Sequence, residues 1–125
     1  MTTFDIIVRG GTVVNHNGEG RADVGATGGC ITAIGDLSRA SAGTIVDATG
    51  LHVLPGVIDT QVHFREPGNP QKEDLESGTR GAALGGVTGV FEMPNTAPPT
   101  TTVEALQDKL ARAKGRAHVD HAFYA

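Results

Sequence analysis

Residues 59–65 carry four polar side chains at every second position, namely Asp59, Gln61, His63 and Arg65. Side chains alternate between the two faces of a β-strand, so these four share one face of a strand predicted over residues 57–64. An imidazole binds metal ions, and a guanidinium pairs with a carboxylate through two hydrogen bonds. The polar face is either solvated surface or part of a site. Parallel sheets usually have both faces covered, which argues against the solvated surface, and the loop at residues 66–70 just past the strand adds support for a site.

A second group of this kind follows the next predicted strand, over residues 87–93. Asn95 comes directly after that strand, and the loop 66–70 follows the first one. Parallel strands that end at the same rim would bring Arg65 and Asn95 together, and an arginine with an amide is a suitable carboxylate-binding pair. Asn95 beside a proline is equally typical of a turn. The spacing alone leaves both interpretations open.

The elements around these residues alternate between strand and helix. A helix is predicted over residues 73–84, with acidic residues in its first turn, and a second one after a capping box formed by Thr101 and Glu104. Its apolar stripe comprises Val103, Leu106, Leu110 and Ala113. With a third strand over residues 118–124, the order is β-α-β-α-β, which predicts an α/β fold with a parallel sheet. A (β/α)₈ barrel needs roughly 250 residues, so we expect residues 57–125 to hold only about two and a half of its units.

The first part of the chain, residues 1–56, has a different pattern. Short apolar runs alternate with glycine pairs and polar turns, which predicts a small β-sandwich or meander. The expected strands cover residues 4–8, 12–14, 22–26, 30–34, 45–47 and 51–54. The Leu-Pro-Gly sequence at residues 54–56 is the expected boundary between this β-sandwich segment and the barrel units.

The composition excludes several classes of protein. A net charge of −4 with scattered acids and bases argues against nucleic-acid binding. The single cysteine, Cys30, fits a reducing compartment, and neither a signal peptide nor a membrane span is recognisable. These features predict a cytoplasmic protein with a small-molecule substrate. His16 and His52 have no partner at ligand spacing and are expected to be structural or surface residues, whereas His118 and His121 would face opposite sides of a strand and so could not easily share a metal.

Two motifs resemble landmarks of the dihydroorotases, which are cyclic amidohydrolases. LPGVIDTQVHFREPG at residues 54–68 is similar to the metal-binding motif of that family, P-G-x-I-D-x-H-V-H-x-R-E-P-G. GGVT at residues 85–88 and MPNT at residues 93–96 resemble its second landmark, and IVRGG at residues 7–11 its opening strand. The resemblance therefore covers the whole chain, as the N-terminal fragment of such a protein. Allantoinases and hydantoinases share the fold, but they usually lack this combination of motifs, which favours dihydroorotase.

The resemblance implies a β-sandwich segment followed by a metal-dependent (β/α)₈ barrel. It implies one or two zinc ions with His63 as a ligand, and a substrate carboxylate held by Arg65 and Asn95. The implied reaction interconverts dihydroorotate and N-carbamoyl-aspartate in pyrimidine synthesis by means of a zinc-bound water. The other ligands and the proton shuttle are expected beyond residue 125. A homo-oligomer, or a complex with a partner enzyme of pyrimidine synthesis, is also among the implied assemblies.

Gln61 departs from the family pattern, because it occupies the position of the first histidine of the H-x-H pair. A neutral amide oxygen is a poorer zinc ligand than an imidazole. Zinc binding is then weakened, or one of two metals is lost, or the chain is a non-catalytic homologue that acts as an assembly subunit. We expect retained activity, since Arg65 and Asn95 have little use without a substrate.

Overall fold

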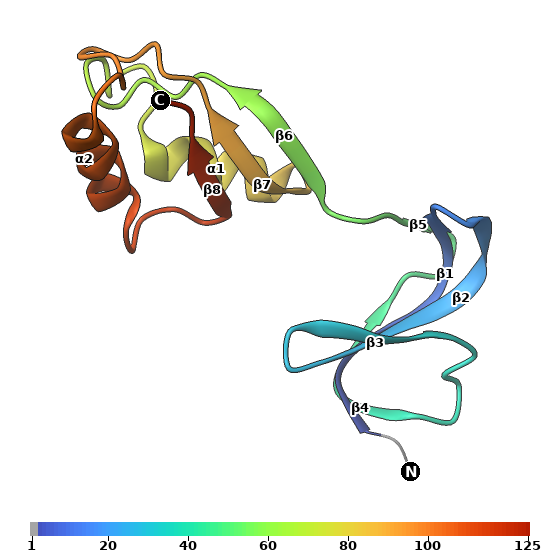
Figure 1. The fold of residues 1–125 in the computed structure, drawn as a ribbon. Helices are drawn as coiled ribbons and strands as arrows, with labels where there is room; N and C mark the ends of the chain where they lie inside the picture. The colour runs from blue at the N-terminus through green and yellow to red at the C-terminus, as the bar shows by residue number, and fades with distance from the viewer. Residues whose placement is uncertain (1–2) are drawn as a thin grey trace. The chain divides into compact units, whose positions relative to one another are not determined.

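The computed structural model describes residues 3–125, which belong to two compact units, Met1–Pro55 and Gly56–Ala125. Each unit contains its own sheet (Figure 1). Residues 1 and 2, part of the N-terminal segment in which no signal peptide is recognisable, lie outside the described residues. No helix within residues 3–125 has the length and apolar character needed to cross a membrane.

The first unit is a single sheet, and its antiparallel part is the meander that the sequence left open as the alternative to a sandwich. Its strand order is β3-β2-β1-β4, with β5 also paired to β1. The first three strands form an antiparallel meander, whereas β4 and β5 run parallel to β1. The long strand β1 thus pairs with β2, β4 and β5, whereas β3 pairs with β2. The strands are β1 Thr3–Asn15, β2 Gly18–Thr27, β3 Cys30–Gly35, β4 Ser41–Asp47 and β5 His52–Val53.

A bulge explains why β1 looked like two strands in the sequence. The register with β2 shifts between Val8 and Gly11, and Gly10 adopts a φ of 77°, which a residue with a Cβ rarely reaches. The buried carboxylate of Asp23 accepts hydrogen bonds from the backbone N–H of Gly10 (2.8 Å) and of Leu37 (3.0 Å). The glycine pair therefore bends the strand without ending it.

The second unit confirms the predicted β-α-β-α-β order. Its sheet has the order β6-β7-β8 with all strands parallel. Three strands do not close into a barrel, and no barrel is present in the part of the chain that the structure describes. The elements are β6 Val57–Val62, α1 Leu75–Leu84, β7 Val87–Glu92, α2 Val103–Ala113 and β8 Asp120–Phe123.

Helix α1 begins two residues later than predicted, at Leu75. Asp74 is its N-cap, and a capping box joins the Asp74 carboxylate to the N–H of Ser77 (2.7 Å) and the Ser77 hydroxyl to the N–H of Asp74 (3.3 Å). Gly78, although glycine is a poor helix former, is required here by packing. A Cβ at this position would collide with the ring of Phe64, which lies in the core of the unit.

Helix α2 differs from its prediction in both its start and its buried face. Thr102 is the N-cap and accepts from the N–H of Ala105 (3.2 Å), so the capping box expected at Thr101 does not form. Ala113 of the predicted stripe is buried and Leu106 is half-buried, but Val103 and Leu110 are 65% and 47% exposed, whereas Lys109 is 1% exposed. The buried face is rotated because Lys109 packs against a buried carboxylate of β7.

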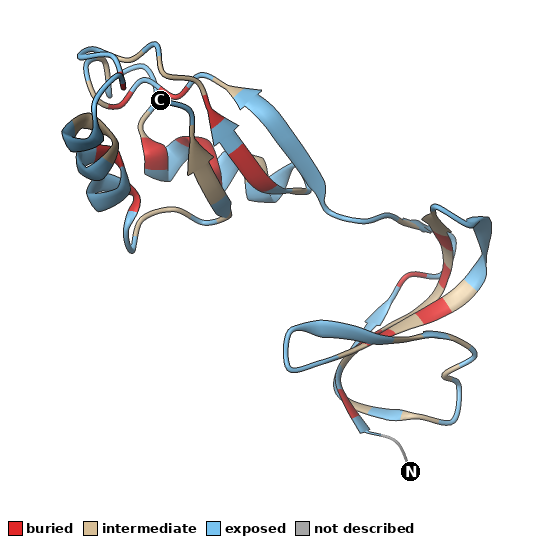
Figure 2. Ribbon diagram, viewed as in Figure 1, coloured by how far each residue is buried: buried red, intermediate tan, exposed pale blue. Residues whose placement is uncertain are grey.

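The two helices cover one face of the β6-β7-β8 sheet (Figure 1). Figure 2 shows the buried segments concentrated on β7 and the inner side of α1, whereas β6 is exposed along most of its length. Phe91 and Tyr124 are 37% and 43% exposed, with ring centroids 6.0 Å apart. The expectation that both faces of this sheet are covered is therefore wrong within residues 56–125.

Candidate active site

The polar row predicted on the first barrel strand lies on β6 and just beyond its end. Asp59 and Gln61 are both exposed, and the Asp59 carboxylate accepts a hydrogen bond from the N–H of Gln61 (3.0 Å). This contact is a local turn of the kind that aspartate makes with the backbone two residues on. That bond uses the backbone of Gln61, and the side-chain amide of Gln61 makes no hydrogen bond within residues 3–125, so the amide remains available.

His63 and Asn95 are brought into direct contact from two neighbouring strand ends. The distance between His63 Nδ1 and Asn95 Oδ1 is 2.9 Å. Because an amide oxygen only accepts, Nδ1 carries the proton and donates it, which leaves the lone pair of His63 on Nε2. A histidine that binds a metal through Nε2 needs this tautomer, which is commonly fixed by a hydrogen bond at the other ring nitrogen. The amide nitrogen of Asn95 then remains free to donate to a ligand.

Arg65 lies on the same rim and lines a cavity of about 340 Å³ together with Asn95. Its side chain is exposed, but its backbone is held on both sides. The N–H of Arg65 donates to the carbonyl of Glu73 (3.1 Å), and its carbonyl accepts from the N–H of Asn69 (2.7 Å). The other lining residues are Phe64, Pro67, Gly68, Asn69, Thr96 and Ala97.

The two loops that carry Arg65 and Asn95 are joined to each other. The N–H of Ala97 donates to the carbonyl of Pro67 at 3.2 Å. Gly68 adopts a φ of 113° and approaches Ala97 so closely that a Cβ on Gly68 would lie 2.7 Å from the Ala97 carbonyl oxygen. The rim is thus a continuous surface rather than two independent turns.

Sequence reasoning missed a buried ion pair directly beneath this rim. Glu92 and Lys109 are each 1% exposed, and Lys109 Nζ lies 3.1 Å from Glu92 Oε2. The ammonium group also donates to the carbonyl of Met93 (3.4 Å) and lies 5.5 Å from the centroid of the Phe123 ring. Burial raises the pKa of Glu92, although the hydrogen bond from Lys109 acts in the opposite direction. Glu92 at an inward position of its strand, two residues after Val90, was the signal available in the sequence.

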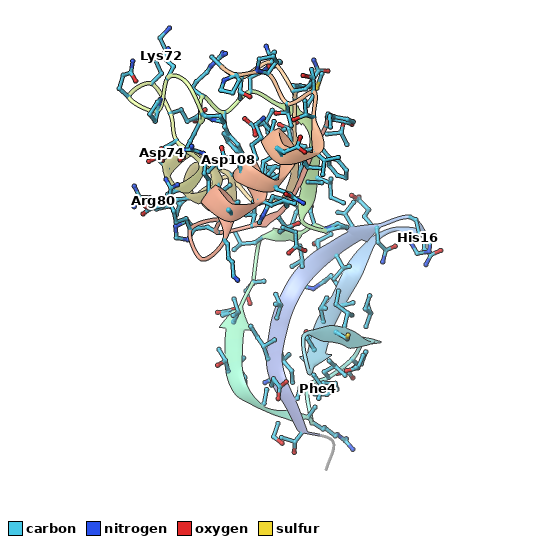
Figure 3. All side chains as sticks on the ribbon, turned by 60° about the vertical axis from the view of Figure 1, so that its left-hand side comes forward. Phe4, His16, Lys72, Asp74, Arg80 and Asp108 are labelled. Carbon is cyan, nitrogen blue, oxygen red and sulfur yellow. The ribbon has the colours of Figure 1, made fainter. Side chains whose placement is uncertain are left out.

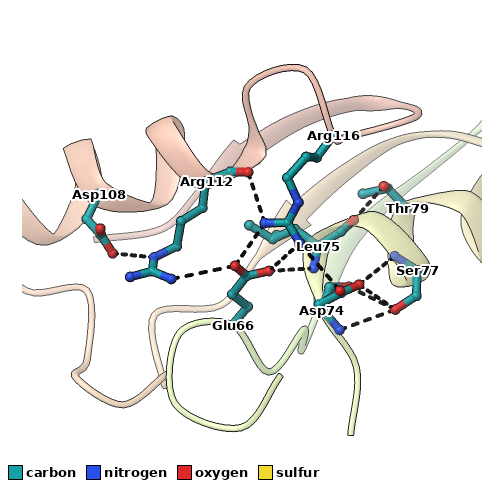
Figure 4. A network of polar contacts seen from close by, with 8 residues as sticks. All are labelled: Glu66, Asp74, Leu75, Ser77, Thr79, Asp108, Arg112 and Arg116. Carbon is teal, nitrogen blue, oxygen red and sulfur yellow. Dashed lines mark hydrogen bonds and ion pairs between the residues drawn. The ribbon is translucent and has the colours of Figure 1, made fainter. Parts of the chain in front are cut away.

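A second missed group is centred on Glu66, which follows Arg65 in the chain (Figure 4). Arg116 binds both of its carboxylate oxygens, at 2.9 and 3.1 Å, and the N–H of Leu75 donates to it at 3.1 Å. The hydrogen bonds from Arg116 lower the pKa of Glu66, despite a partial opposing effect of burial. Fifty residues separate the partners in the sequence, so no local pattern indicated the pair.

The remaining histidines are dispersed as expected. His16 projects from the tip of the β1–β2 hairpin (Figure 3), and His52 lies on β5. His121 Nδ1 lies 3.3 Å from the carbonyl of Val119, whereas the backbone N–H of His118 donates to the Thr79 hydroxyl (3.1 Å). Cys30 is exposed and unpaired by any disulfide.

At the ends of β6 and β7, the imidazole nitrogen that is open to a zinc ion is Nε2 of His63. Across residues 3–125 there is no cluster of three histidine, cysteine, aspartate or glutamate side chains able to hold a metal ion. A catalytic zinc site uses about three protein ligands. His63 therefore fits the role of one ligand, while the described residues do not form a complete site.

The strand-end histidine, the arginine–asparagine rim and the parallel β/α units define the N-terminal region of a cyclic amidohydrolase. A family model described as dihydro-orotase-like matches residues 50–125, and the chain belongs to this family. Its relatives include an allantoinase from Rubrobacter xylanophilus, which is 52% identical over 99% of this chain and 27% of its own length. A dihydroorotase from Bacillus subtilis is 47% identical over 81% of this chain and 24% of its own length.

Solved structures give the same result. The L-hydantoinase from Arthrobacter aurescens superposes with a TM-score of 0.86 at 37% identity, over 98% of this chain and 28% of that chain. The chain thus spans about a quarter of the length of the relatives that it matches. The expected preference for dihydroorotase over allantoinase is not supported by these similarities, because the allantoinase from R. xylanophilus has the higher identity.

Proposed function

We propose that the whole protein hydrolyses the C–N bond of a cyclic amide whose ring bears a carboxylate, with dihydroorotate and N-carbamoyl-aspartate as its reactant pair in pyrimidine synthesis. The observation that carries this proposal is the shared cavity of Arg65 and Asn95, which lies beside His63. The guanidinium of Arg65 supplies two parallel donors for the carboxylate, and the free amide N–H of Asn95 supplies another.

His63 contributes to this reaction through the tautomer that its contact with Asn95 fixes. Its Nε2 is a candidate ligand of the zinc ion that the family implies, and such an ion provides Lewis acidity and a water of lowered pKa. Asn95 then has two roles at once, since its oxygen orients the imidazole and its nitrogen faces the substrate. The chain's own residues thus bind and orient the ring at the strand ends.

A second candidate is allantoin hydrolysis, which the 52% identity to the R. xylanophilus allantoinase favours. Allantoin carries no carboxylate, so it makes no use of a bidentate arginine. An assay of the whole zinc-supplemented protein with dihydroorotate, allantoin and hydantoin separates the candidates. We expect kcat/KM to be highest for dihydroorotate. A preference for allantoin would overturn this assignment, and no turnover of any substrate would establish the non-catalytic homologue.

Gln61→His is expected to raise the zinc affinity of the whole protein by roughly tenfold or more, a scale on which even indirect partners of zinc ligands act. The reason is that an imidazole replaces a neutral amide at an exposed position on the same face as His63. Competition with a chromogenic chelator measures the affinity. Thr60→His, at the neighbouring exposed position of β6, is the matched control. Equal affinities of the wild type and Gln61→His would show that position 61 is not a ligand position.

A further inference from the structure

Glu66 joins three segments that lie apart in the sequence (Figure 4). It belongs to the loop after β6, it accepts from the N–H of Leu75 at the start of α1, and it binds Arg116 just after α2. Arg112 of α2 adds a more distant contact at 3.6 Å. Both oxygens of this carboxylate therefore have charged or backbone donors.

Arg116 extends the same network on its other side. It lies 3.4 Å from the N-cap carboxylate of Asp74 and donates to the carbonyl of Arg112 (3.2 Å). One guanidinium thus connects the capping box of α1 to the end of α2 while it holds Glu66 in a bidentate pair. Such a pair fixes orientation as well as providing attraction, because both N–H···O bonds must be aligned.

The position of Glu66 next to Arg65 gives this network a functional consequence. Glu66 is 6% exposed and points into the unit, whereas Arg65 is exposed and lines the rim cavity. Consecutive residues thus point to opposite sides of one loop. Because the N–H of Arg65 is also bound to Glu73, the anchored carboxylate leaves the backbone of Arg65 little freedom to turn.

We infer that Arg116, through its bidentate pair with Glu66, is a positioning residue that directs Arg65 toward the substrate carboxylate. This inference rests on the proposed function, in which Arg65 binds that carboxylate. Arg116 itself lies away from the cavity lining and touches no reacting group. Arg116 affects substrate selection through Glu66, which fixes the orientation of Arg65.

Arg116→Gln in the whole protein tests this inference. We expect KM for dihydroorotate to rise roughly 10- to 100-fold, the scale of a misplacement of about 1 Å, with kcat and the KM for hydantoin changed less than threefold. Arg80→Gln is the matched control, because Arg80 forms only an exposed pair with Glu76 on α1 (Figure 3). Circular dichroism and urea unfolding show whether each variant is folded.

A double-mutant cycle with Arg65→Met separates positioning from general loosening of the fold. If Arg116 acts through Arg65, Arg116→Gln has no further effect on KM in the Arg65→Met background. The inference is overturned if Arg116→Gln leaves KM unchanged, raises it equally for hydantoin, or acts equally in both backgrounds. An Arg65→Met variant with unchanged KM for dihydroorotate would overturn the proposed carboxylate role instead.

Discussion

Replacing Lys109 with methionine is expected to lower the free energy of unfolding of the second unit by about 3–5 kcal/mol, the usual cost of removing one member of a buried ion pair. The partner Glu92 is 1% exposed and 3.1 Å from the ammonium group, so the substitution leaves its carboxylate without compensation. Methionine keeps the length and apolar character of the stem. Urea unfolding at pH 7, followed by circular dichroism, measures the change.

The double variant Lys109→Met with Glu92→Gln is the control for this prediction. It removes both charges while keeping the shape of the pair, so it should be clearly more stable than Lys109→Met alone. Lys114→Met, on an exposed residue after α2, reports the effect of losing a lysine without burial. If Lys109→Met unfolds at the same urea concentration as the wild type, the pair is not buried in solution.

The loss of stability in Lys109→Met is expected to depend on pH. Burial raises the pKa of Glu92 in the folded state above its ordinary value of 4.5. A folded state that binds a proton more tightly than the unfolded one loses stability as the pH rises from 4.5 through the folded pKa. Because Lys109 opposes this shift, its removal enlarges it. The decrease in the free energy of unfolding caused by Lys109→Met should therefore be smallest at or below pH 4.5 and largest at neutral pH.

Arg65→Met is expected to reduce kcat/KM for dihydroorotate by roughly 100-fold or more, which corresponds to the loss of a charged pair of about 3 kcal/mol. Hydantoin has no carboxylate, so its kcat/KM should change less than threefold. Arg65 is exposed and makes no side-chain hydrogen bond within residues 3–125, so its removal costs the fold little. Steady-state kinetics of the whole protein with both substrates measure the ratio.

Arg80→Met is the matched control for Arg65→Met, because it removes an equally exposed arginine from α1, outside the rim cavity. It should leave both substrates unaffected. A loss of the same size on dihydroorotate and hydantoin would show that Arg65 supports the fold or the chemical step and does not recognise a carboxylate.

The sequence by itself determined the order of the elements and the positions of the rim residues. Apolar alternation gives strands their faces and glycine pairs mark their ends, and these patterns are local in the chain. The alternation from Asp59 onward places His63 near the carboxyl end of the first barrel strand, which the structure ends at Val62, and the same reasoning puts Asn95 beyond β7. Parallel pairing of the two strands was expected to bring Arg65 and Asn95 together, and both line one cavity, whereas the 2.9 Å contact between His63 and Asn95 was not predicted.

Only the tertiary structure decided which face of α2 is buried and what the inner carboxylates bind. Apolar spacing assigned Leu110 to the core, whereas the helix is rotated to place Lys109 over Glu92. The Glu66–Arg116 pair likewise joins residues that no periodicity relates. The physical reason is that burying an unpaired charge costs more free energy than is gained by burying one apolar side chain. The helix orientation that pairs the charge is therefore the more stable one. Local patterns in the sequence carry no information about such a partner.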